Sequence, residues 1–375
     1  MEGKLRLDFA KIDISGDLRN EVSKTINHVK RESRNAVKPS QCILCSKEKT
    51  SFCNSHSIPQ FCLKSISVDG KVLTLNSLIE MGFLSEESGV KSTGTFKLVC
   101  RECDNSFFKD YENPDYYKLN EPNQGILGQI ATKNYLMEIS KIREQIEVLS
   151  RMKSCCGLEG QIEHQINVRE LDLSESEKNL RKAIRVGSGS ARGYDLFLFE
   201  RIGHVVPFAF QGMVNLISDF DGRMINNVFN YSSNYKIEPV HLCVFPCSGY
   251  SVVLGFHDSR VKRFNRFKAK LGSLEPSERL LAVEKVIFAY SEEPYLSKSL
   301  PENVVQDEGL KRLAKMNSVY VNSLLIDGPG EAREIDLACR EYAISNLPDA
   351  PNLFDADFAM LNEACFSLGV LWLGG

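Results

Sequence analysis

Four cysteines carry the clearest chemical signal in this 375-residue chain. They form two Cys-x-x-Cys pairs, Cys42 with Cys45 and Cys100 with Cys103, and 54 residues separate the pairs. Each pair can bend into a knuckle that presents two thiolates to one cation, and two knuckles complete the tetrahedral site that zinc prefers. Free cysteines are often simply buried apolar groups, but the paired spacing argues against that here. The sequence therefore predicts a structural zinc site.

One histidine and one acidic helix start lie close to these pairs in the sequence. His56 lies between the pairs and is followed by Ser57-Ile58-Pro59, while Asp104 and Asn105 directly follow the second pair at the start of a predicted short helix. If one zinc ion joins both knuckles, we expect His56 to face a carboxylate across a second metal. Alternatively, His56 is a core or turn histidine, or it replaces one cysteine in the zinc shell.

These motifs resemble the HNH nucleases of the ββα-metal, treble-clef group. The similarity rests on Ser-His-x-Ile-Pro between two knuckles and on Cys-Asp-Asn-x-x-Phe-x-x-Tyr-Glu after the second, and it covers about residues 38–115. It implies that the four-cysteine zinc is structural. It also implies that His56 is the general base that activates water against a phosphodiester, and that Asp104 and Asn105 hold a catalytic Mg2+ or another divalent cation.

One position departs from the family pattern. Many members carry Asp or Glu immediately before the histidine, where this chain has Ser55. A neutral hydroxyl is a weak ligand for Mg2+, which prefers charged oxygens. The catalytic metal must then depend on Asp104, the substrate phosphate and waters, or be a softer ion that accepts His56 itself. Otherwise the activity has been lost.

Composition limits how the chain can contact nucleic acid. With 43% hydrophobic and 25% charged residues, it is long enough for two or three globular domains. The net charge of −3 excludes bulk polycationic binding, so any contact with nucleic acid must be local. A basic run at 24–49 has a local charge of +5. We expect phosphate contacts from four nearby residues, although a solvated helix face is equally open: Arg31, Arg34, Lys38 and Lys64.

A second basic run alternates with aromatic residues. Residues 262–270 hold five lysines and arginines interleaved with Phe264 and Phe267. Such a run can bind a single strand by phosphate contacts and base stacking. The two phenylalanines are also good core anchors, which is the interpretation we favour.

Cysteine usage and hydropathy indicate the compartment. Twelve cysteines, of which only four are paired as in metal sites, favour a reducing environment over a disulfide scaffold. We find neither an apolar signal-peptide core nor a run of about 18 apolar residues. We therefore expect a cytoplasmic protein with no membrane contact.

The elements around the motifs predict an α+β fold. We expect a basic helical segment at 1–37, a ββα-metal treble-clef zinc domain at 38–125, a helical connector at 126–186 and a larger mixed α+β domain at 187–375. Asp69-Gly70 predicts a β-hairpin over 64–75. Apolar spacing predicts an amphipathic helix at 126–153, and alternating Glu, Lys and Arg predict a second helix at 161–186 as its antiparallel partner. The glycine-rich stretch at 187–193 predicts a linker or turn. Strands are expected at 195–200, 205–210, 213–220, 224–229, 240–245 and 250–257, and helices at 277–290, at 307–316 and from 355 onward.

The sequence leaves two main functions open. The first is a metal-dependent HNH-type endonuclease that cuts nucleic acid, with DNA the expected substrate. By analogy alone, it is a bacterial restriction or antiviral defence effector. Residues 187–375 would then bind substrate, a regulatory protein partner or a second copy in a homo-oligomer. The alternative is an inactive treble-clef zinc module that binds nucleic acid or protein. A purely structural interaction protein is a third possibility.

Overall fold

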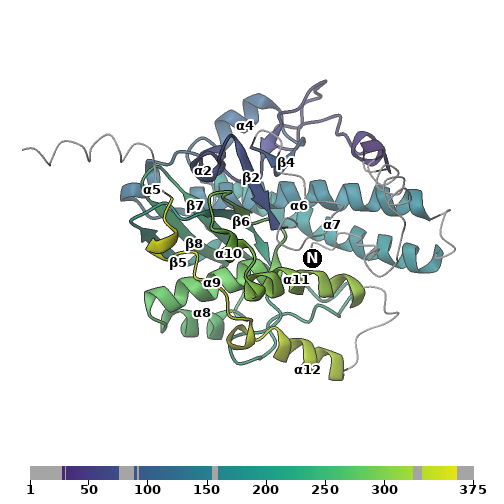
Figure 1. The fold of residues 1–375 in the computed structure, drawn as a ribbon. Coiled ribbons are helices and arrows are strands. Elements are labelled where there is room, and N and C mark those ends of the chain that lie inside the picture. Colours follow the sequence, from purple (N-terminus) through teal and green to yellow (C-terminus); the bar gives the residue numbers. More distant parts are fainter. Residues whose placement is uncertain are drawn as a thin grey trace, which may run out of the picture.

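The computed structural model describes residues 28–29, 31–75, 88–90, 93–153, 159–323 and 332–360. Within them, an antiparallel sheet lies at the centre of the molecule, in the strand order β3-β2-β9-β6-β7-β8-β5 (Figure 1). The predicted α+β fold class is thus confirmed. The strands of this sheet are β2 (Lys71–Thr74), β3 (Ser88–Gly89), β5 (Tyr194–Ile202), β6 (Phe208–Val214), β7 (Val240–Pro246), β8 (Ser251–Asp258) and β9 (Tyr295–Leu296).

The sheet is buried on both faces. Every residue of β7 is buried: Val240, Leu242 and Val244 belong to one core, while Cys243 and Phe245 belong to the other. This alternation follows from the two-residue period of a strand. On the first face pack α8 (Asn265–Gly272), α9 (Pro276–Tyr290) and α11 (Glu308–Ser323), and on the second α2 (Gln60–Ile66) and α6 (Gln124–Met152).

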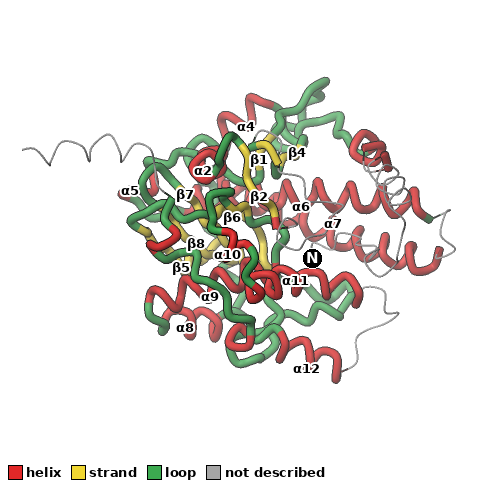
Figure 2. Tube along the Cα trace, viewed as in Figure 1, coloured by secondary structure: helices red, strands yellow, loops and turns green. Residues whose placement is uncertain are grey.

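The predicted pair of long helices is confirmed. Helix α6 runs beside α7 (Glu159–Gly187), and the two extend together to one side of the sheet (Figure 2). Gly128 near the start of α6 meets Gly187 at the end of α7, so the helices are antiparallel. A Cβ atom added at Gly128 would lie 2.2 Å from the Gly187 nitrogen, which explains why neither helix carries a side chain at this crossing.

The described residues of the predicted zinc segment, 38–125, contain the short helix expected after the second cysteine pair, but their strands differ from the prediction. Strand β1 (Ser55–His56) pairs with β4 (Thr95–Phe96), and α4 (Arg101–Phe107) follows. The first half of the hairpin predicted at 64–75 is wrong, because Lys64–Ile66 end helix α2, whose apolar side chains face the core. The Asp69-Gly70 turn itself is confirmed, with both residues at positive φ between the paired Val68 and Lys71.

Other predictions meet mixed outcomes. Strands β5, β7 and β8 and helices α9 and α11 lie where expected. The two strands predicted over 205–220 are one strand, β6, and 224–229 contains only the isolated bridge between Ser218 and Met224 around the Asp221-Gly222 turn. The stretch at 187–193 is a turn between α7 and β5, as predicted. The described part of the chain also contains the short or peripheral helices α5 (Tyr116–Leu119), α10 (Glu302–Val305) and α12 (Ala332–Glu341).

Some predictions fall outside the described residues. These include most of the N-terminal segment 1–37, in which the described residues 28–29 and 31–36 are helical. Most of the last predicted helix also lies outside them, and its described beginning forms only a 3-10 turn at Ala356–Phe358. No helix in the described part of the chain is long and apolar enough to cross a membrane.

The zinc segment and the C-terminal half share the central sheet. Strand β2, from the segment predicted as 38–125, pairs with β9 through Leu73 and Leu296. Helix α6 also spans both parts, since Asn134 contacts the ring of His241 on β7 at 3.0 Å. Burial lowers the pKa of His241 to about 3, so this ring is neutral inside the sheet core. The segments therefore form one packed body around α6.

Candidate zinc centre and neighbouring ionic cluster

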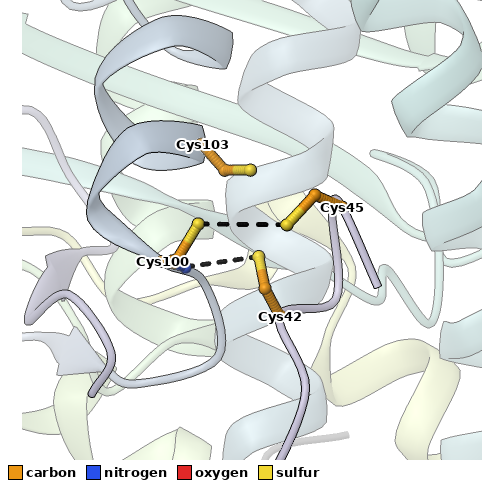
Figure 3. Close-up of side chains that lie close together, drawn as sticks. All are labelled: Cys42, Cys45, Cys100 and Cys103. Atoms are coloured by element: carbon orange, nitrogen blue, oxygen red, sulfur yellow. Dashed lines mark hydrogen bonds between the residues drawn. The ribbon is translucent and has the colours of Figure 1, made fainter. Parts of the chain in front are cut away.

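The four predicted cysteines meet at one point. Their sulfur atoms all lie within 4.8 Å of one another, with Cys45 Sγ 4.0 Å from Cys100 Sγ. Figure 3 shows the four side chains converging from a loop and from α4. A zinc ion with bonds of about 2.3 Å to four sulfurs needs sulfur separations of about 3.8 Å. The donor type, number and spacing therefore fit a four-thiolate zinc site, in which zinc would cross-link the loop to the helix.

Local backbone geometry forms both knuckles. In the first, Ser46 adopts a left-handed φ of 57° and donates its N–H to the Cys42 carbonyl at 2.8 Å. In the second, Cys100 caps the start of α4 and places Cys103 one turn along. The Cys100 N–H donates to Cys42 Sγ at 3.3 Å. An amide proton directed at sulfur favours the thiolate that zinc binds.

The electrostatics of the cluster call for a cation. Burial raises the pKa of the Cys103 thiol far above its ordinary value, and hydrogen bonds to Cys100 and Cys45 raise it further. Four sulfurs this close cannot all ionise without a compensating positive charge. Zinc binding reverses this balance, because the ion displaces the thiol protons.

A second group of side chains lies beside the cysteines, and we call it the ionic cluster: Ser55, Asp104, Glu112 and Lys133. The Lys133 ammonium donates to Ser55 Oγ at 2.7 Å and Asp104 Oδ1 at 3.0 Å, and it lies 3.1 Å from Glu112 Oε1. The Ser55 hydroxyl donates to Asp104 Oδ1 at 2.6 Å. The Lys133 side chain is only 1% exposed. The ammonium thus donates to two oxygen atoms of the chain and forms an ion pair with a third.

Asp104 is ionised and held on both oxygens. Burial opposes its ionisation, but the charge of Lys133 and the hydrogen bonds from Ser55 and Lys133 outweigh burial, so its pKa lies below the usual value. Its second oxygen accepts from the Cys53 thiol at 3.3 Å. Burial and the Asp104 charge raise the pKa of Cys53 to about 11, which keeps that thiol protonated and able to donate.

His56 points to the other side of β1. Neighbouring residues of a strand alternate in direction, so Ser55 meets Asp104 while the half-buried His56 places Nε2 3.0 Å from the Val90 carbonyl oxygen. The expectation that His56 faces this carboxylate is not met by these contacts. A carbonyl can only accept, so Nε2 is the donor in this contact. The catalytic roles assigned to His56, Asp104 and Asn105 stay predictions.

The helix start does not fit a divalent metal in this arrangement. Both oxygens of Asp104 are already hydrogen-bonded, and the adjacent ammonium supplies the positive charge that a metal would bring. A divalent cation placed there would face Lys133 at close range and be repelled. Asn105 is exposed on α4, but a single neutral amide is a poor Mg2+ site.

The predicted phosphate-binding residues lie at the surface. Arg31, Lys38 and Lys64 are exposed, while the exposed Arg34 pairs with Glu144 of α6 at 3.0 Å. The stacking interpretation of the second basic run is wrong, because its two phenylalanines, Phe264 and Phe267, are 0% and 3% exposed and belong to the core. Four basic residues of that run, Lys262, Arg263, Arg266 and Lys270, are exposed, while Lys268 is partly buried and pairs with Asp195.

From the sequence alone, we predicted neither Lys133 nor Glu112 as a site residue. A signal for Lys133 exists: it continues the four-three-four spacing of Ile126, Ile130 and Met137, which places it on the buried stripe of α6. A lysine on such a stripe needs a buried anionic partner. The spacing does not show which carboxylates provide this partner.

Comparisons with family models, curated proteins and solved structures found no match to this chain.

Proposed function

We propose that the chain is a zinc-stabilised nuclease of HNH type that hydrolyses phosphodiester bonds in nucleic acid, with DNA as the first substrate to test. The observation that supports this most is the setting of His56. Its ring is half-buried on a strand beside the cysteine cluster, and its Nε2–H is held by the Val90 carbonyl. With Nε2 engaged in this contact, Nδ1 is the ring nitrogen left to act as the general base toward water.

Zinc would act in this proposal as a structural cross-link. Cys42 and Cys45 would join Cys100 and Cys103 around the ion, which ties the first knuckle to α4. Because Cys53 donates its backbone N–H to the Val99 carbonyl at 2.9 Å, the same cross-link also fixes the entry to β1 and so the position of His56. All four zinc positions are taken by sulfur, so the ion itself has no open position for substrate.

Binding of nucleic acid would rest on a local basic surface. Arg31, Lys38 and Lys64 are exposed and can neutralise phosphates, whereas Arg34 is already paired with Glu144. Since the whole chain carries −3, we expect weak binding that falls steeply with salt. A role in restriction or antiviral defence remains an analogy with nucleases that act on foreign DNA.

A second candidate function is a zinc module that binds nucleic acid or protein without cutting. The observation that favours it is the pairing of Asp104 with Lys133. Phosphodiester hydrolysis needs a positive charge on the developing oxyanion as well as a base. Lys133 is shielded from solvent and gives its protons to the chain, so it offers no such charge to a substrate.

One cleavage assay separates the two candidates. Zinc-loaded protein is incubated with supercoiled plasmid and with single-stranded DNA and RNA, in the presence of Mg2+, Mn2+ or Ni2+. If the nuclease proposal holds, His56→Ala lowers the cleavage rate about 100- to 10,000-fold, because a positioned base is lost. The control is His204→Ala, since His204 is also half-buried with Nε2 3.0 Å from a carbonyl, that of Phe354.

Each outcome has a definite meaning. Cleavage that persists unchanged in His56→Ala, or that is lost equally in His204→Ala, overturns the role of His56. A wild-type protein that retards the nucleic acid in a gel but never cuts it supports the second candidate. A protein that neither binds nor cuts leaves the structural interaction protein as the remaining function.

A further inference from the structure

The ionic cluster has the form of a cation site that already contains its cation. Three oxygen atoms, from Ser55, Asp104 and Glu112, lie 2.7 to 3.1 Å from the Lys133 nitrogen. They come from β1, from α4 and from the segment just after α4. On another side, the ring of Phe108 lies 4.1 Å from the same nitrogen, close enough for a cation–π contact.

The donor set around this nitrogen is typical of sites for hard cations. Two carboxylates and a hydroxyl are ligands that Mg2+ and Mn2+ accept when waters complete the shell. The centre of the cluster is buried, since Ser55 and Lys133 are each 1% exposed. A buried ammonium is tolerated in such a place only if its charge is balanced, and here it forms ion pairs with both Asp104 and Glu112.

We propose that the Lys133 ammonium is the resident cation of this site, in the position that a divalent metal takes in a carboxylate site. In the native chain, Asp104 and Glu112 therefore take up neither Mg2+ nor Mn2+. Removal of the ammonium alone creates a divalent site from the remaining oxygens. This holds whether or not the chain is a nuclease, and if cleavage depends on a metal, that metal binds away from Asp104.

Lys133→Met is the sharpest variant. Methionine keeps the apolar stem as far as the Cε position and deletes only the ammonium, so the vacated volume is that of one small cation. Glu112 has a side chain that is 37% exposed, which gives an ion a route from solvent. Two carboxylates without a counter-charge then attract a divalent cation strongly.

The experiment measures Mn2+ binding by the loss of the free-ion electron paramagnetic resonance signal. Zinc-loaded wild type, Lys133→Met and the double variant Lys133→Met with Asp104→Asn are titrated, and zinc content is checked in each. We expect no stoichiometric Mn2+ site in the wild type, about one equivalent in Lys133→Met, and loss of that site in the double variant. Mn2+ should also raise the unfolding temperature of Lys133→Met and leave that of the wild type unchanged.

A matched control accompanies the Mn2+ titration, and either of two results would overturn the proposal. Lys141→Met removes another α6 lysine, one paired with Glu293, and should gain no Mn2+ site. One equivalent of Mn2+ on the wild type that Asp104→Asn abolishes would overturn the proposal. So would a folded Lys133→Met that binds none. If Lys133→Met fails to fold without metal, recovery of its fold in Mn2+ supports the proposal, and the titration is repeated with Lys133→Gln.

Discussion

Two clusters share helix α4, and they balance the charge of their closely spaced groups in opposite ways. The cysteine cluster and the ionic cluster meet at Cys103 and Asp104, which are neighbours in α4. The first brings four sulfurs together with no positive side chain among them, so it depends on an ion from outside. The second surrounds the chain's own ammonium and needs no such ion. One helix thus combines a metal-dependent joint with a metal-independent one.

The difference assigns distinct structural tasks to the two clusters. Within the zinc segment, residues 38–125, which we call the zinc region below, the cysteines join the first knuckle to α4. Lys133 joins that region to α6, which packs on the central sheet. Loss of zinc should therefore loosen the zinc region while the sheet stays folded. Loss of Lys133 should weaken the link between the region and α6.

Zinc removal tests the first half of this comparison and should give the largest effect. We expect Cys100→Ser to lose zinc and to lose amide protection in the first knuckle and α4, since structural zinc contributes about 10 kcal/mol or more in small zinc domains. Metal analysis and hydrogen exchange measure both. Cys53→Ser is the control, because Cys53 lies outside the cluster and should keep zinc. Full zinc retention in Cys100→Ser would contradict the assignment.

A double-mutant cycle tests the second half, with an intermediate effect. Lys133→Met leaves two carboxylates without a counter-charge and should lower the free energy of unfolding by about 3 kcal/mol. In the double variant of Lys133→Met with Asp104→Asn, the free energy of unfolding should fall by about 1–2 kcal/mol less than the sum of the two single losses. Urea unfolding of zinc-loaded proteins measures these values. Strictly additive losses would mean that the two side chains do not stabilise each other.

A solvent-accessible pair between the first knuckle and α4 sharpens the comparison and should give the smallest effect. Lys49 and Glu102 lie 3.1 Å apart, with side chains 28% and 75% exposed. Two hydrogen bonds lower the pKa of Glu102 to about 2; the larger effect comes from Cys100 and the next from Lys49. Solvent screens such a pair, so Lys49→Ala should leave the urea midpoint unchanged within error. A loss as large as that of Lys133→Met would show that burial is not what separates the two pairs.

Much of the candidate site follows from short sequence spacings. Two Cys-x-x-Cys pairs can each form a knuckle by local turns, and the positive φ of Ser46 and the helix start at Cys100 provide those turns. The Asp69-Gly70 turn and the long amphipathic helices α6 and α7 were predictable for the same reason. In each case the determining contacts lie within a few residues along the chain.

Longer-range contacts explain the predictions that failed. Residues 64–66 look like a strand, but they continue α2 because Cys62, Leu63 and Ile66 then face the core together. Residues 224–229 look like a strand too, yet they form only an isolated bridge at Met224, while Ile225 and Val228 pack into the core. Burial against distant elements outweighs local propensity at such places.

The sequence by itself determined the four thiols, the turns that present them and the helical stripe on which Lys133 lies. Only the tertiary structure decided that Ser55 rather than His56 meets Asp104, and that Lys133 neutralises that carboxylate. The lysine is 78 residues from Ser55 and 29 from Asp104 along the chain. Partners so distant are chosen by how α6, β1 and α4 pack, and the cost of burying an unpaired charge then fixes which side chains must meet.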